Sequence, residues 1–318
     1  MAAKCAYTAG ELGSLFFLKE VDYGKTPTGT MKAGLYSTAW QRQDDKHRYR
    51  QYLPGSRSYD VNTSVDQGND VAFSVSGPLR AATVGIDWAE PLISGAFGIP
   101  SGSSIATGDL DILPSYSILM QLGSTAKANL EQVLYNGCKV NTLNISADQP
   151  KAVIAVNATV FAQFAEKLAA SKATKLQTMD ITTATDAITS RPAAIQWNSG
   201  IKVGTTDFYP ESWSISVDNG LGRTSGPLIG ADTNTYVGTR CLTEGQRNIT
   251  LSMVCWFKDY KIIEDQLDNA KAGNVEIPLS NGKKITLSNN RYTLSLPEHI
   301  QDRHQITVNL DCAEAAVV

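Results

Sequence analysis

The first residues that could do chemistry are Gly24, Lys25 and Thr26, the triplet that closes a phosphate-binding loop. Such a loop also needs a glycine five positions before its Gly-Lys pair, because bare backbone amides must curl around the anion. Lys19 stands at that position, and Pro27, directly after the triplet, has no backbone N–H to donate. The triplet therefore does not predict a nucleotide site.

Other patterns of catalysis or metal binding are equally weak. The set His299, Asp302 and His304 lacks the paired ligand spacing of a metal site. No serine has glycines two places away on both sides, as a nucleophile elbow requires, and the glycines of 220–226 are misspaced for a dinucleotide fingerprint. The sequence predicts no catalytic residue, no metal and no cofactor, and hence a protein that is not an enzyme.

Composition narrows the class further. The chain has 318 residues, of which 42% are hydrophobic and 19% charged, and its formal net charge is −3. These values are typical of a globular protein, and an acidic chain has no general attraction to nucleic acid. The longest apolar runs, such as 15–18 and 152–156, are too short to span a bilayer. The first residues lack the apolar core of a signal peptide, so we expect synthesis in the cytoplasm of a host cell.

Five cysteines favour a reducing compartment. They are odd in number, widely spaced and free of CxxC, so neither a disulfide framework nor a zinc site is indicated. Cys241 and Cys255 flank an expected hairpin that turns near Gly245, and its register would keep the two sulfurs apart. We expect buried free thiols.

Period-two alternation of apolar and small polar residues dominates the chain. It is typical of strands with one buried face, and it predicts an antiparallel β-sandwich or barrel. The strands that it predicts are 71–76, 213–218, 249–257, 284–288, 292–296 and 306–310. Expected core faces are those of Trp213, Ile215 and Val217 and of the odd-numbered residues in 249–257.

Turn residues and helical spacing add local detail. Residues 277–287 predict a tight hairpin across Asn281 and Gly282, which tolerate positive φ. Residues 259–272 predict one flanking helix, with Asp259 as its N-cap and Gly273 after its end. Residues 161–170 are expected to run from strand into a short helix.

Two stretches, 77–114 and 171–200, are rich in small and turn-forming residues and predict long loops. Within the first, residues 88–96 indicate an apolar turn of helix. Loops of this length in a compact domain usually serve contacts or function.

The one locally basic stretch, 41–57, contains Arg48 and Arg50 among tyrosines. Basic residues between aromatics can follow a nucleic-acid backbone. We favour an exposed segment that forms salt bridges to another copy or another protein, because the whole chain is acidic and the stretch carries its own Asp pair.

Several segments, in their order along the chain, resemble the tail tube proteins of long-tailed viruses of bacteria or archaea. Residues 20–27 (EVDYGKTP) resemble the arm of that family, and 213–221 (WSISVDNGL) resemble its most recognisable strand and turn. The other segments that carry the resemblance are 67–76, 88–97, 135–146, 257–260, 294–297 and 306–310.

The resemblance implies a single tail-tube domain over 1–318, with a flexible N-terminal arm at 1–34 and a β-rich core at 35–318. It implies homohexameric rings that stack into a hollow virion tail tube, through which viral DNA passes without specific binding. Further expected partners are the tape measure, tail tip and tail terminator proteins and, where the tail has one, a sheath protein; no membrane anchor is implied. The residues expected at the assembly interface are Phe16, Phe17, Leu18, Tyr23, Arg48 and Arg50.

Two other functions share the same strands and turns. A β-sandwich binding, adhesion or capsid-type module of a virus would form a small oligomer with an exposed aromatic patch. A carbohydrate-active enzyme would need a cleft with two carboxylates of separated pKa values; Asp44 with Asp45, or Asp109 with Asp111, are compatible with such a pair, but nothing in the sequence singles them out.

Overall fold

Antiparallel strands make up most of the structure, a computed structural model of the chain. Strands account for 68% of it, and no barrel is closed among the residues described, which confirms a mainly β fold of the sandwich type. The residues that the structure describes are 13–25, 27–30, 32–34, 39–52, 59–80, 89–98, 113–122, 131–148, 152–168, 179–180, 194–197, 200–229, 235–256, 268, 270–293, 298–300 and 303–317.

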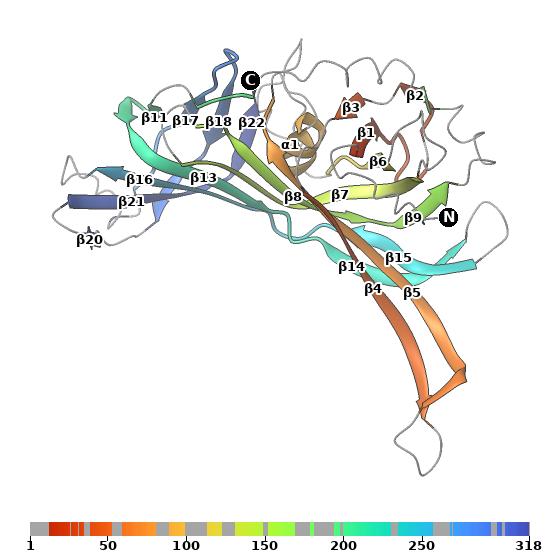
Figure 1. The fold of residues 1–318 in the computed structure, drawn as a ribbon. Helices are drawn as coiled ribbons and strands as arrows, with labels where there is room; N and C mark the ends of the chain where they lie inside the picture. Colours follow the sequence, from red (N-terminus) through yellow and green to blue (C-terminus); the bar gives the residue numbers. More distant parts are fainter. Residues whose placement is uncertain are drawn as a thin grey trace, which may run out of the picture.

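A large sheet runs across the molecule, and α1 (Glu90–Phe97) and a smaller sheet lie on one side of it (Figure 1). Its strands follow the order β14-β15-β5-β8-β7-β13-β16-β21-β19. Their bounds are β5 Tyr59–Pro78, β7 Glu131–Ala147, β8 Ala155–Ala162, β13 Pro210–Asp218, β14 Gly222–Ile229, β15 Thr235–Thr243, β16 Asn248–Trp256, β19 Arg291–Thr293 and β21 Arg303–Cys312. Two further strands extend its edges: β4 (Ala39–Tyr52) pairs with β5, and β20 (Glu298–Ile300) pairs with β21.

Strand β7 belongs to two groups of strands, because it changes partners near its middle. Its first half pairs with β6 (Tyr116–Leu122) and β9 (Phe164–Leu168), whereas its second half pairs with β8 and β13. The change coincides with Gly137, whose φ is +63°, and with a register shift between Val140 and Thr142. Strand β6 pairs in turn with β1 (Gly13–Lys19), and β1 with β3 (Lys32–Gly34). Separately, β2 (Gly29–Thr30) pairs with β10 (Met179–Asp180).

A second sheet of five strands covers part of the large one, in the order β12-β11-β17-β18-β22. Its strands are β11 Ile201–Val203, β12 Thr206–Phe208, β17 Val275–Pro278, β18 Lys284–Ser288 and β22 Glu314–Val317. The expected hairpin across Asn281 and Gly282 is confirmed: Ile277 lies opposite Ile285, and Gly282 has a φ of +80°.

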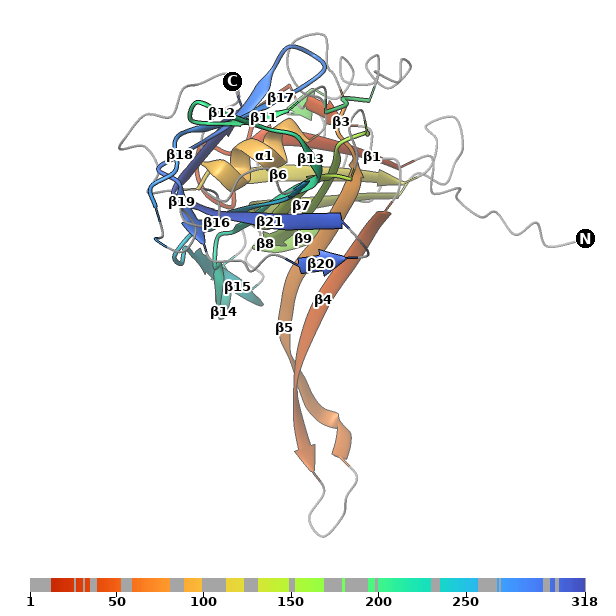
Figure 2. The same cartoon turned by 90° about the vertical axis from the view of Figure 1, so that its left-hand side faces the viewer.

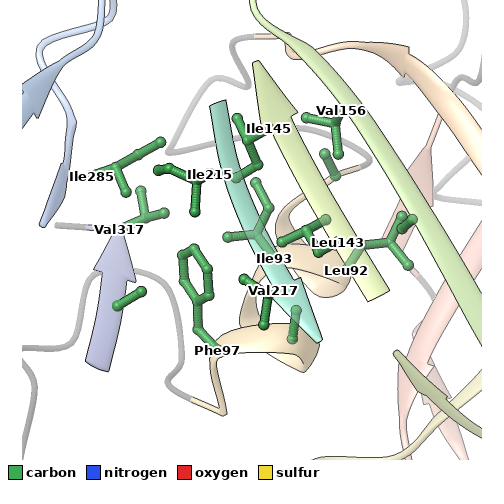
Figure 3. Packing of buried hydrophobic residues seen from close by; sticks show 14 of the residues in the cluster. Leu92, Ile93, Phe97, Leu143, Ile145, Val156, Ile215, Val217, Ile285 and Val317 are labelled. Atoms are coloured by element: carbon green, nitrogen blue, oxygen red, sulfur yellow. The ribbon is translucent and has the colours of Figure 1, made fainter. Parts of the chain in front are cut away.

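Helix α1 (Glu90–Phe97) lies beside this second sheet and packs on β7, β13 and β22. Every described side chain in it is buried, so it is a core helix rather than an amphipathic surface helix. Gly95 allows the close approach, since a Cβ there would lie 3.1 Å from side-chain atoms of Tyr116 and Val140. Figure 3 shows Leu92, Ile93 and Phe97 against Leu143, Ile145, Ile215 and Val217 of the large sheet and Ile285 and Val317 of the second sheet.

Some expectations held and others did not. Trp213, Ile215 and Val217 are buried, as are the described odd-numbered residues of 249–255; Phe257 lies outside the described residues. The helix expected over 259–272 also falls mostly outside them, and its described end is not helical, because Lys271 forms a β-bridge with Arg291. In the expected loop 77–114, the apolar turn is confirmed as α1.

Two local predictions were wrong. Residues 164–168 continue as strand β9, because pairing with β7 at Gln132–Asn136 outweighs their helical propensity. The expected hairpin between Cys241 and Cys255 does not form: β15 pairs with β14 and β5, and β16 pairs with β13 and β21. The chain from Asn219 to Arg247 is thus inserted between two strands that pair with each other.

Candidate assembly surfaces

One face of the large sheet carries the core, and the other presents small polar residues, a surface here called the polar face. Every residue of the polar face is partly or fully exposed, whereas most of its neighbours along the strands are buried. Its residues are Ser74, Ser76, Thr142, Asn144, Ser146, Ala155, Asn157, Thr159, Phe161, Ser212, Ser214, Ser216, Asp218, Asn248, Thr250, Ser252, Val254, Thr307, Asn309 and Asp311.

Strand register aligns these residues into rows across the sheet. Ser216, for example, lies directly opposite Asn144 on β7 and Thr250 on β16. The row through it is Ser76, Asn157, Asn144, Ser216, Thr250 and Asp311, and the next is Ala155, Ser146, Ser214, Ser252 and Asn309. Aligned hydroxyl and amide groups offer hydrogen bonds to water in every row but very little charge.

The charged residues among those of the polar face are two carboxylates. Asp218 and Asp311 lie near one end of the rows, on strands separated by β16. The residues of the polar face include no lysine or arginine. Two basic side chains lie beside Phe161 at the margin of this face: the buried Lys139 of β7 is opposite Phe161, and the Arg223 guanidinium lies 3.8 Å from the centre of the Phe161 ring. Arg291, on the edge strand β19, lies opposite Asp311. The central wall of the sheet is therefore neutral to acidic.

A second candidate surface is the long hairpin of β4 and β5, which projects away from the rest of the chain (Figure 2). Strand β5 pairs with β8 only from Val71 to Pro78. Residues 59–70 of β5 come before this stretch, and their partners in the described structure are β4 along the strand and β15 at Asn69. A two-stranded hairpin is marginally stable by itself in water, so its projecting part is suited to pairing with something else.

The structure places the expected interface residues in two different settings. Phe16 and Phe17 are 0% and 2% exposed and lie on β1, which pairs with β6 and β3 of the same chain. Their apolar surface is thus used by their own core, in contrast to the loose arm expected for residues 1–34. Leu18 and Tyr23 remain partly exposed. Arg48 and Arg50 lie on the projecting part of β4, where Arg48 is opposite Asp66.

Residues 20–25 form a turn that is held in place by hydrogen bonds to Glu20. The Glu20 side chain is buried, and its carboxylate accepts hydrogen bonds from the backbone N–H groups of Gly24 and Gly137, each at 2.8 Å. The Ser117 hydroxyl lies 2.8 Å from the same carboxylate. Gly24 has a φ of +74°, which suits a tight turn. The Gly-Lys pair thus belongs to a turn that Glu20 ties to β6 and β7.

The thiols differ in exposure and acidity. Cys138, Cys255 and Cys312 are buried, as expected, whereas Cys241 is exposed. Burial raises the pKa of Cys312 to about 12, with a further rise from the charge of Asp311. Burial, helped by the charge of Glu20, also raises the pKa of Cys138 well above its usual value. These two thiols remain protonated, and therefore unreactive, near pH 8.

Sites of other kinds do not emerge from the described part of the chain. Within it, no group of three or more His, Cys, Asp or Glu is placed to hold a metal ion. His299 and His304 lie opposite each other on β20 and β21, and Asp302 falls outside the described residues. No helix in the described residues is long and apolar enough to cross a membrane.

Sequence reasoning missed the polar face as a surface, although it used the same alternation to predict strands. Alternation says which residues share a face of one strand, but the rows depend on which strands pair and in what register. A run of strands whose outward residues are nearly all Ser, Thr or Asn is the signal that could have indicated it.

Comparison with known proteins adds an independent finding. A family model described as phage tail tube protein matches residues 10–312, which is nearly the whole chain. The comparison with curated proteins gave no match.

Proposed function

Since the chain belongs to the phage tail tube protein family, we propose that six copies close into a ring and that rings stack into the hollow tube of a viral tail, with the polar face lining the lumen. The family places the protein in the tail of the virus particle. Viral DNA then passes along the polar face during ejection. The observation that carries this assignment is that the rows through Ser216 and Ser214 hold no lysine or arginine on β8, β7, β13, β16 and β21.

Electrostatics favours the polar face for this role. A lysine or arginine on the wall would neutralise phosphates and hold the duplex, and each such contact would be repeated in every copy of every ring. Hydroxyl and amide groups instead bind water, and Asp218 and Asp311 repel phosphate. A duplex can therefore slide past such a wall without a specific contact.

Pairing between copies would come from strand edges and from the projecting hairpin. A heterologous contact that is repeated by rotation closes a ring and leaves no edge free. We assign the hairpin of β4 and β5, with Arg48 and Arg50, to the contact with a neighbouring copy, together with the partly exposed Leu18 and Tyr23. Phe16 and Phe17 are left out of this interface, because they are buried in their own chain.

The remaining partners follow from the position of a tube within a tail. We propose that the assembled tube encloses a tape measure protein, begins at the tail tip and ends at a terminator protein, and that a sheath surrounds it where the tail is contractile. The chain itself is made in the host cytoplasm before it is assembled.

Site-directed labelling tests both the tube and its lumen. In a background of Cys5→Ser and Cys241→Ser, the remaining cysteines are buried, so a new thiol is the main target at pH 8. Ser216→Cys reports on the polar face, and Lys202→Cys, on an exposed position of the second sheet, is the matched control.

We expect concentrated protein to form open-ended tubes of uniform width in negative-stain electron microscopy. In these tubes, a small maleimide should label both variants, whereas a maleimide that carries a bulky polymer should label Lys202→Cys and miss Ser216→Cys. Unassembled protein should accept the bulky reagent at both positions. Isolated particles under all conditions, or a Ser216→Cys thiol in tubes that still reacts with the bulky reagent, would contradict the proposal.

A further inference from the structure

The hairpin of β14 and β15 is an insertion with a narrow base, here called the neck and made of residues 219–222 and 243–247. Strands β13 and β16 pair directly at Asp218 and Asn248, so both ends of the insertion leave the sheet at the same point. The two chains of the neck touch through backbone atoms: a Cβ on Gly245 would lie 2.4 Å from the Gly220 carbonyl oxygen. Gly220 also has a φ of +55°.

Polar contacts tie one side of the neck to α1 and β7. Asn219 is 2% exposed, and its side-chain amide donates to the carbonyl oxygens of Ala96 (3.2 Å) and Val140 (2.9 Å). The Arg247 guanidinium donates to the Phe97 carbonyl at 2.9 Å and to the Asn219 side-chain oxygen at 3.2 Å. The guanidinium also places positive charge at the C-terminal end of α1, which the helix dipole favours.

Glu244 ties down the other side of the neck. Its carboxylate oxygens each lie 3.0 Å from the backbone nitrogen of Leu113, and one of them pairs with the ammonium group of Lys139, whose residue is buried on β7. Burial lowers the pKa of Arg247, and the charge of Glu244 opposes that shift. Contacts of this kind leave the base of the insertion little freedom to turn.

Beyond the neck, the insertion reaches the projecting hairpin. Strand β15 pairs in parallel with β5 at Gly238 and Asn69, only two residues before β5 begins its pairing with β8 at Val71. Near the neck, the Arg223 guanidinium stacks on the Phe161 ring of β8, 3.8 Å from its centroid. Strand β15 therefore meets β5 at the place where the long hairpin leaves the rest of the sheet, as Figure 1 shows.

We propose that the neck, through Asn219, Glu244 and Arg247, holds the β14–β15 hairpin as a support that sets the direction of the projecting β4–β5 hairpin, and that this direction sets the geometry of contact between copies. The neck residues are thus positioning residues for assembly. The inference rests on the proposed function, because it concerns the contact between neighbouring copies to which the β4–β5 hairpin is assigned there.

Arg247→Gln tests the proposal because it removes the charge that faces the end of α1 while keeping a polar side chain. Glu244→Gln is the second variant, at a partly exposed position, in case the first fails to fold. The control is Glu276→Gln, which breaks an exposed ion pair on the second sheet, away from the neck. Hydrogen exchange of the backbone amides of residues 59–70 is measured on unassembled protein, and tube width and assembly rate are measured by microscopy and light scattering.

In both neck variants we expect the amides of 59–70 to exchange at least about tenfold faster, while the strands of the core keep their protection. Assembly should slow by a similar factor or give tubes of uneven width, and the control should match the wild type. A disulfide between Asn69→Cys and Gly238→Cys, in the Cys5→Ser and Cys241→Ser background, should restore uniform tubes to Arg247→Gln when oxidised and lose that effect on reduction.

The outcomes separate this inference from the proposed function. If the wild type forms no tubes, the proposed function fails, while hydrogen exchange still decides whether the neck supports the hairpin. If the wild type forms tubes and both neck variants form the same tubes with unchanged exchange, the neck has no positioning role. Failure of the oxidised disulfide to rescue Arg247→Gln would also overturn the inference.

Discussion

The polar face of the large sheet and the outer face of the five-stranded sheet lie on opposite sides of one core, yet they differ in chemistry. Both consist of outward positions on antiparallel strands. On the five-stranded sheet these positions hold long charged side chains: Lys202 lies opposite both Asp207 and Glu276, and Glu276 pairs with Lys284 at 2.6 Å. On the polar face they hold mostly Ser, Thr and Asn, with three apolar residues (Ala155, Phe161 and Val254) and with carboxylates near one end of the rows.

The difference shows that folding alone does not require an uncharged outer face. Lysine and glutamate are accepted on the outward positions of the second sheet, where they pair across strands. A strand that needs only a soluble outer face could have carried the same residues on β13 or β16. The neutral composition of the polar face therefore reflects what touches that face, and the proposed lumen supplies the reason.

The largest expected effect is on DNA retention, and it follows from placing a lysine on the polar face, which removes the difference in charge between the two faces. Ser216→Lys adds a positive charge to the middle of the rows, once in every copy of every ring. We expect assembled tubes of this variant to retain a short DNA duplex roughly a thousandfold more strongly than wild-type tubes at low salt, because several lysines can neutralise phosphates together. Retention should fall steeply as salt rises. The measurement is sedimentation of tubes with a fluorescent duplex over a salt series.

Thr286→Lys is the matched control for that experiment. Thr286 lies on the outer face of the second sheet, directly opposite Glu276, so the added charge has a local partner and faces away from the proposed lumen. We expect these tubes to behave like the wild type. If both lysine variants retain DNA equally, the polar face has no special relation to the duplex.

Local sequence was enough to predict the strands and their buried sides. The alternation in 213–218 and 249–255 identified Ile215 and Leu251 as core residues, and the Asn281-Gly282 pair identified a tight turn. Each of these features depends on residues within one strand or one turn. Patterns with a short sequence range are therefore readable from the chain itself.

The sequence did not predict which distant strands pair with each other. Strand β16 could equally have paired with β15, its neighbour in sequence, and it pairs with β13 because a complete hairpin is inserted between them. The family resemblance implied an arm at 1–34, because the sequence does not show that β6 lies beside residues 15–18. The polar face and the neck are products of such long-range pairings, so both required the structure.

A second prediction sharpens the contrast between the two sides of β13. Ile215 is fully buried and Ser216 is exposed, although they are adjacent in the chain. Ile215→Ala should lower the free energy of unfolding by about 2–5 kcal/mol, because it leaves a cavity between the large sheet and α1. Ser216→Ala should change it by less than about 0.5 kcal/mol. Urea unfolding of the unassembled chain measures both. Equal losses at the two positions would show that the polar face also serves stability.

The smallest expected effect concerns the charges of the second sheet. Glu276→Gln removes the partner of Lys284, and both side chains of this pair are more than two-fifths exposed, at 43% and 42%. Solvent screens such a pair, so the loss of unfolding free energy should stay below about 1 kcal/mol and vanish in concentrated salt. Chemical unfolding in urea, at low and high sodium chloride, measures it. A loss of about 2 kcal/mol or more that survives high salt would mean that the outer charges are needed for folding. In that case the two faces would differ because one sheet depends on its charges for stability, and the neutral composition of the polar face would no longer point to the lumen.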